Sequence, residues 1–286
     1  MLPLLSLAAA TLLTVPPRPA ASGIATTPAR RAAVAAEMAR IPAGSYLPLY
    51  GRRNDPRVRV AAFALDREPV TRGDFLAFVR ANPSWRRGAV RPVFAERGYL
   101  ASWRGDLDPS TGSAQVAGNA GDLRRPVTEI SWYAAKAYCA AQGKRLPTTD
   151  EWEYAAAASE THADAAREPG FVRRLLALYA GRASGGVLPA VGAGFRNVYG
   201  VRDLHGLAWE WTLDFNGVLV SDDSREAGSG VGERDHTLFC ASAAIGATDP
   251  TNYPGFMRYA FRAGLTGRST IRTLGFRCAS GGPAAR

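Results

Sequence analysis

The residues best suited to do chemistry lie in one short run, DLHGLAWEWT, at positions 203–212. Trp209 and Trp211 flank Glu210, directly after the His205-Gly206 turn. A carboxylate held between two large rings loses its water, so it costs free energy unless hydrogen-bond donors or an arginine satisfy it. The run therefore predicts either a shaped site or a rigid polar network.

Cysteine and histidine supply the other reactive groups. The three cysteines are Cys139, Cys240 and Cys278, so an exported chain would hold one disulfide and one leftover thiol. His236 stands four residues before Cys240, which suggests a metal-binding pair, but the sequence shows no third and fourth ligand beside it. His205 fits a hydrogen-bonded structural histidine. Cys240 itself fits either a reactive thiol or a buried small apolar side chain.

Composition limits the classes of partner. The 286-residue chain is 47% hydrophobic and contains six Trp, which is ample for a packed core. Its formal net charge is +10, and the arginines that supply most of it are scattered from end to end. Nucleic-acid binders cluster their basic residues on one face, so we expect no nucleic-acid partner. An acidic protein partner is compatible with this charge.

The N-terminus has the pattern of an export signal. Residues 2–15 are apolar and uncharged, too short to span a bilayer, and Ala20-Ala21-Ser22 offers small residues for cleavage. We expect a signal peptide at 1–22, a disordered linker at 23–37 and one domain at 38–282. The mature protein would then be periplasmic or secreted, with no stable membrane span.

Capping residues and periodicity predict the elements that position these groups. Thr71 and Ser131 are placed to cap helices, and Thr148 with Glu151 forms a capping box. Residues 83–125 predict an ordered loop layer with buried aromatics. From Gly181 onward the pattern shows only turns and short strands. The predicted elements are strands at 40–49, 57–65 and 127–130, and helices at 72–81, from 131 to 143, from 148 and at 171–179.

Four segments in order resemble the formylglycine-generating enzyme family, also called the sulfatase-modifying factor family. They read RPVTEISW (125–132), GKRLPTTDEWEYA (143–155), NVYGVRDLHGLAWEW (197–211) and LGFRCA (274–279). The resemblance implies an α+β fold with little regular secondary structure, distantly similar to C-type lectins. It also implies a disulfide between Cys139 and Cys278. The core is expected to contain both cysteines with Trp132, Trp152, Trp209, Trp211 and Phe276.

The chain departs from the active members of that family at the metal site. Those enzymes oxidise a substrate cysteine to formylglycine with one copper ion held by two cysteines, a soft pair that suits Cu(I). Here Cys240 and Ser242 match the preceding Gly-Gly-Ser element, and residues 243–256 contain no cysteine. Arg258 and Arg262 match family arginines of the groove region, which we expect to bind a partner polypeptide together with Trp209. If this chain binds copper, it must do so through a site other than the two-cysteine site of those enzymes.

A second departure concerns calcium. Many members have Asn at the position of Leu207, where it helps the residue matching Glu210 to bind a calcium ion. Calcium requires several hard oxygen ligands, so the loss of one weakens the site. The sequence therefore favours a structural role for Glu210, bonded to backbone N–H groups or to an arginine, over a calcium site.

Four functions remain open from the sequence. The first is an exported maturation or accessory factor that binds a partner polypeptide, and the wording around 239–246 and 256–262 is closest to the NirV-type accessory proteins encoded with copper nitrite reductases. That partner would be a periplasmic metalloenzyme. The second is an active oxidase using Cys240, with Ser242 beside it. The others are a copper-handling protein using Cys240, His236 and Met257, and a glycan-binding module of lectin-like ancestry.

Overall fold

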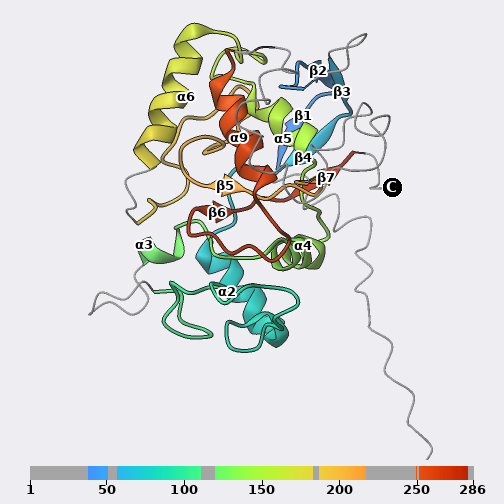
Figure 1. Cartoon of the computed structure of the whole chain (residues 1–286). Helices are drawn as coiled ribbons and strands as arrows, with labels where there is room; N and C mark the ends of the chain where they lie inside the picture. Colours follow the sequence, from blue (N-terminus) through green and yellow to red (C-terminus); the bar gives the residue numbers. More distant parts are fainter. Residues whose placement is uncertain are drawn as a thin grey trace, which may run out of the picture.

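In the computed structural model, the described residues are 38–50, 57–110, 120–182, 187–216, 249 and 251–282. The predicted signal peptide and linker, and the candidate residues His236, Cys240 and Ser242, lie outside these ranges. The described parts form a mixed α/β structure with short strands and long irregular connections (Figure 1).

Each of the first two predicted strands is divided into two. The 40–49 region forms β1 (Ala39–Ile41) and β2 (Gly44–Tyr46), and the 57–65 region forms β3 (Val58–Val60) and β4 (Phe63–Leu65). β1 pairs antiparallel with β4, and β2 pairs antiparallel with β3. Pro42 separates the first two, because proline cannot donate to a ladder.

The C-terminal strands fasten the end of the domain to its beginning. β7 (Ala279–Gly281) pairs antiparallel with the other edge of β4, which gives the sheet order β1-β4-β7. β5 (Trp209–Glu210) pairs parallel with β6 (Leu274–Gly275). The run around Glu210 is thus held against the segment that leads into Cys278.

Three helices begin at the predicted caps. In α2 (Arg72–Ala81), Thr71 and Asp74 bond each other's backbone N–H groups, and in α4 (Trp132–Ala141) the Ser131 side chain accepts from the backbone N–H of Ala134. In α5 (Thr149–Ala156), Thr148 and Glu151 form the predicted capping box. Shorter helical pieces are η1 (Pro83–Trp85) and α3 (Ala120–Leu123), and α6 spans Pro169–Arg182 over the predicted 171–179 helix.

The structure corrects two of the predicted elements. Residues 127–130 are not a strand: Glu129 has a positive φ of 58°, and the nearest β pairing is an isolated bridge between the preceding Pro126 and Thr71. The C-terminal part is not limited to turns and strands, because Tyr253–Ala263 forms an 11-residue helix, α9. Pro254 and Gly255 are residue types typical of turns, yet proline is compatible with the first turn of a helix, and the Asn252 side chain accepts from the backbone N–H of Gly255.

The core is packed around the predicted disulfide. The sulfur atoms of Cys139 and Cys278 are bonded, with a Cα–Cα distance of 5.6 Å, and both residues are fully buried. The 83–125 region contributes Tyr99, Leu100 and Trp103 to the core as an irregular layer. The predicted core residues are buried except Trp132 and Trp209, which are only partly buried against it. Within the described residues, no helix is long and apolar enough to cross a membrane.

Candidate functional site

Glu210 lies in a buried network with Arg277 and Trp152. Its two carboxylate oxygens accept from Nε and Nη2 of Arg277, each at 2.8 Å, and Oε2 also accepts from the indole Nε1 of Trp152 at 2.7 Å. The Arg277 and Glu210 side chains are 0% exposed. A calcium ion at Glu210 would have to displace Arg277, and no group of three or more potential metal ligands occurs in the described parts of the chain. The carboxylate of Glu210 thus forms an ion pair with one arginine, Arg277. Calcium binding at Glu210 stays a prediction.

A second buried carboxylate, Glu153 of α5, was not singled out by the sequence. Nε of Arg258 donates to both oxygens of Glu153 at 2.9 Å, and Nη2 of Arg258 donates to Oε2 at 2.6 Å. Nη1 of Arg262 donates to Oε1 at 2.5 Å. All three residues are buried. Burial alone would raise the pKa of Glu153, but the charges and hydrogen bonds of Arg258 and Arg262 outweigh it and lower the pKa to about 2. Glu153 is therefore ionised at every physiological pH.

Hydrogen bonds extend this cluster to α6. Nη1 of Arg258 donates to the Tyr179 hydroxyl at 3.2 Å, and that hydroxyl lies 2.8 Å from Nδ1 of His205. Nε2 of His205 lies 2.9 Å from the carbonyl oxygen of Ala156, which can only accept. In a neutral imidazole the proton is therefore on Nε2, and Tyr179 donates to Nδ1. His205 has the structural role expected from the sequence.

The three predicted groove residues lie in one neighbourhood, but two of them are not free anchors. Trp209 stacks on Phe261 of α9, with ring centroids 4.7 Å apart, and contacts Tyr179. Arg258 and Arg262 are buried and both donate to Glu153, and the expectation that they bind a partner polypeptide together with Trp209 stays a prediction. The i, i+4 spacing on α9 places both guanidinium groups on its buried face.

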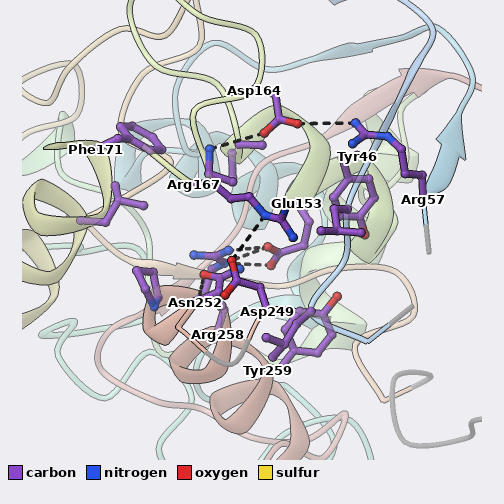
Figure 2. Close-up of a pocket in the computed structure, with 18 residues that line it drawn as sticks. Tyr46, Arg57, Glu153, Asp164, Arg167, Phe171, Asp249, Asn252, Arg258 and Tyr259 are labelled. Atoms are coloured by element: carbon purple, nitrogen blue, oxygen red, sulfur yellow. Dashed lines mark hydrogen bonds and ion pairs between the residues drawn. The ribbon is translucent and has the colours of Figure 1, made fainter. Parts of the chain in front are cut away.

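A pocket lies over this cluster, between the segment after β2, the end of α5, the start of α6 and the start of α9 (Figure 2). Its volume is about 80 Å³, which admits a few water molecules or one short side chain. Apolar residues form much of its wall, and the charged groups are Arg258 with Glu153, Arg57 with Asp164, and Arg167 with Asp249. Of the predicted groove residues, only Arg258 lines this pocket.

The family model described as "Sulfatase-modifying factor enzyme 1-like domain" matches residues 24–281. The protein named inactive C-alpha-formylglycine-generating enzyme 2 of Bos taurus is 31% identical over 257 residues, covering 78% of this chain and 79% of that protein. The formylglycine-generating enzyme of Streptomyces coelicolor is 28% identical over 313 residues, covering 92% of this chain and 95% of the enzyme. The solved structure of PvdO from Pseudomonas aeruginosa aligns with a TM-score of 0.39 and 18% identity over 84% of this chain and 92% of PvdO.

The chain therefore belongs to the sulfatase-modifying factor family, and its fold is the α+β fold of that family. Its relatives include both formylglycine-generating enzymes and proteins named as inactive counterparts.

Proposed function

We propose that the protein is an exported maturation or accessory factor that binds a partner polypeptide and does not oxidise cysteine. The supporting observation is the use of its cysteines. Of three cysteines, Cys139 and Cys278 form the buried disulfide, so Cys240 is the only thiol left. One thiolate cannot make a copper site that requires two soft ligands from the same chain.

The described part of the chain nevertheless keeps a bonded, buried framework. The Glu210–Arg277 and Glu153–Arg258–Arg262 clusters are fully bonded, and removing one member of such a buried cluster is costly. A family fold that lacks the two copper-binding cysteines fits a role in binding a polypeptide. The similarity to relatives named inactive formylglycine-generating enzyme 2 supports the same proposal.

A direct assay separates this proposal from the alternative of an active oxidase using Cys240. The purified chain is incubated with a cysteine peptide of the sulfatase type, O2 and copper, and the aldehyde product is measured by hydrazone formation and mass. The formylglycine-generating enzyme of Streptomyces coelicolor, treated in parallel, is the positive control. We expect no aldehyde from this chain, and turnover that disappears in Cys240→Ser would establish the oxidase instead.

The partner is proposed to be a periplasmic metalloenzyme, with a copper nitrite reductase as the particular candidate. This rests on the subgroup resemblance around 239–246 and 256–262 and on the apolar N-terminal segment. Affinity capture from a periplasmic extract should recover one specific protein, and co-expression should raise the copper content or activity of the reductase. Recovery of no specific protein, or an unchanged reductase, would count against it.

Copper handling by this chain itself is tested in the same preparation. Met257 is 41% exposed on α9, whereas the other two proposed ligands lie outside the described residues. Copper bound in proportion to protein, and lost in Cys240→Ser, would favour this function over a purely polypeptide-binding role.

A further inference from the structure

The pocket above Glu153 has an unusual balance of charge at its base. One carboxylate, Glu153, is shared by two guanidinium groups, Arg258 and Arg262, so the buried cluster carries one excess positive charge. The three residues are between 4% and 8% exposed. Because water screens a buried charge poorly, this excess acts on whatever enters the pocket.

Hydrogen-bond donors also remain available there. Each terminal nitrogen of Arg258 carries two N–H groups and uses one, Nη1 for Tyr179 and Nη2 for Glu153. Tyr259, one residue further along α9, lines the pocket and is 8% exposed. Its ring contacts Tyr50 edge-on, but its hydroxyl makes no hydrogen bond to any residue in the described ranges. This hydroxyl can therefore donate to a ligand oxygen that enters the pocket.

The pocket rim adds two arginines that each form a long ion pair with an aspartate. Arg57 lies 3.5 Å from Asp164, and Arg167 lies 3.4 Å from Asp249, with both arginine side chains about half exposed or more (Figure 2). These contacts are single and long, whereas the Arg258–Glu153 pair is doubly bonded at 2.6–2.9 Å. Exposed pairs of this kind are worth less than about 1 kcal/mol, so Arg167 can turn to an incoming anion at little cost. Arg57 is held more firmly, because it also donates to the Ser45 hydroxyl at 3.1 Å and to the Ser45 carbonyl oxygen at 2.8 Å.

The volume and the walls define the size of the ligand. About 80 Å³ accommodates the end of one side chain but not a folded peptide segment. The walls include Leu47, Leu49, Pro254 and Leu175, which suit the aliphatic stem of a short chain. An ammonium group would meet the excess positive charge of the buried cluster at the base, and a purely apolar group would not use the Tyr259 hydroxyl or the N–H groups of Arg258.

We propose that this pocket binds a carboxylate at the end of a short aliphatic stem, presented by the partner polypeptide as an acidic side chain or as its C-terminus. The carboxylate bonds to Tyr259 and Arg258 and is enclosed at the rim by Arg167 or Arg57. This inference rests on the proposed polypeptide-binding function and specifies the chemistry that the partner must present.

The test uses the purified chain and small probes at constant ionic strength. Propionate and its neutral isostere propionamide are titrated, with binding followed by chemical-shift changes of the tryptophan and backbone N–H groups. We expect propionate to bind at least tenfold more tightly than propionamide. Equal binding of the two, or binding of propylammonium in preference to propionate, would overturn the proposal.

Matched variants locate the site. Tyr259→Phe removes only the unpaired hydroxyl and should weaken propionate binding about tenfold, the size of a lost hydrogen bond to a charged group. Tyr253→Phe is the control, because Tyr253 is 62% exposed on the same helix and does not line the pocket. Arg167→Gln should weaken binding and Arg173→Gln should not. If Tyr259→Phe retains wild-type thermal stability and wild-type affinity, the carboxylate does not bind here.

Peptides then distinguish the two sources of the carboxylate. A peptide ending in Glu with an amidated C-terminus is compared with a neutral peptide that has a free C-terminus. The failure of both would refute the partner chemistry proposed here, even if the chain forms no aldehyde and captures a partner by another surface. The aldehyde assay is independent of this result, so the two proposals can fail separately.

Discussion

Replacing Glu153 by glutamine tests whether the buried cluster holds α5 and α9 together. Glutamine keeps the shape of the side chain and one carbonyl oxygen but removes the charge that Arg258 and Arg262 share. Both arginines would then lie buried beside a neutral group, and the amide N–H groups would face guanidinium donors. The variant isolates electrostatics from packing.

The expected loss of stability follows from burial. Removing one partner of a buried ion pair costs about 3–5 kcal/mol, because the remaining charge is uncompensated. The lowered pKa of Glu153 gives a similar figure: a fall from 4.5 to about 2 corresponds to about 3 kcal/mol of preference for the ionised form in the folded state. At about 2–4 °C per kcal/mol for a domain of this size, a loss of about 3–5 kcal/mol should lower the melting temperature by about 6–20 °C.

Glu160→Gln is the matched control. Glu160 also forms a doubly bonded pair, with Arg174 at 2.6 Å for both contacts, but its side chain is 41% exposed. Its loss should cost less than about 1 kcal/mol. Urea unfolding of both variants, followed by tryptophan fluorescence with the disulfide intact, gives the two free energies. Similar losses for the two variants would refute the argument that burial makes the Glu153 cluster structurally essential.

Three further predictions concern the same framework. The free energy of unfolding should fall as the pH drops from about 4.5 to about 2. The ionised Glu153 stabilises the folded state fully above the pKa it has in the unfolded chain, and this stabilisation is lost as the pH falls through its lower pKa in the folded protein. The urea midpoints of the wild type and Glu153→Gln should therefore converge over this interval. Cys139→Ala should lower the melting temperature far more than Cys240→Ala. The disulfide between Cys139 and Cys278 spans 139 residues and contributes about 5 kcal/mol to stability by restricting the unfolded chain. Equal melting temperatures of the two variants would contradict this. Thr148→Ala should cost about 1 kcal/mol in a urea titration by removing the capping box of α5, whereas the exposed Thr161→Ala should be neutral, and a neutral Thr148→Ala would show that tertiary contacts alone hold the helix end.

The sequence predicted the parts of the fold that depend on neighbouring residues. The caps at Thr71, Ser131 and Thr148 act on backbone groups three residues away, so their pattern is visible in the sequence. The order of four family segments identified the fold and the disulfide partners. The helix α9 was missed because Pro254 and Gly255 resemble a turn when no cap is recognised before them.

The candidate site was only partly predictable, because its bonds join residues far apart in the chain. The cost of a buried carboxylate predicted a partner for Glu210 but not that Arg277, 67 residues later, would supply it. Glu153 gave no signal at all, since its partners are 105 and 109 residues away. The i, i+4 spacing of Arg258 and Arg262 could have suggested a shared carboxylate, provided that the helix carrying them had been predicted.

Trp152 physically joins the two buried carboxylate clusters. Its indole N–H donates to Glu210, and its ring lies beneath the guanidinium of Arg262, 5.0 Å from the ring centroid. A change in the Glu153 cluster therefore alters the packing of the Trp152 ring, whose indole N–H is hydrogen-bonded to Glu210. Trp152 is 3% exposed and packs in the hydrophobic cluster that also contains Phe63 and Leu65. The positive base of the pocket and the Glu210–Arg277 pair therefore rest on the same packed side chain.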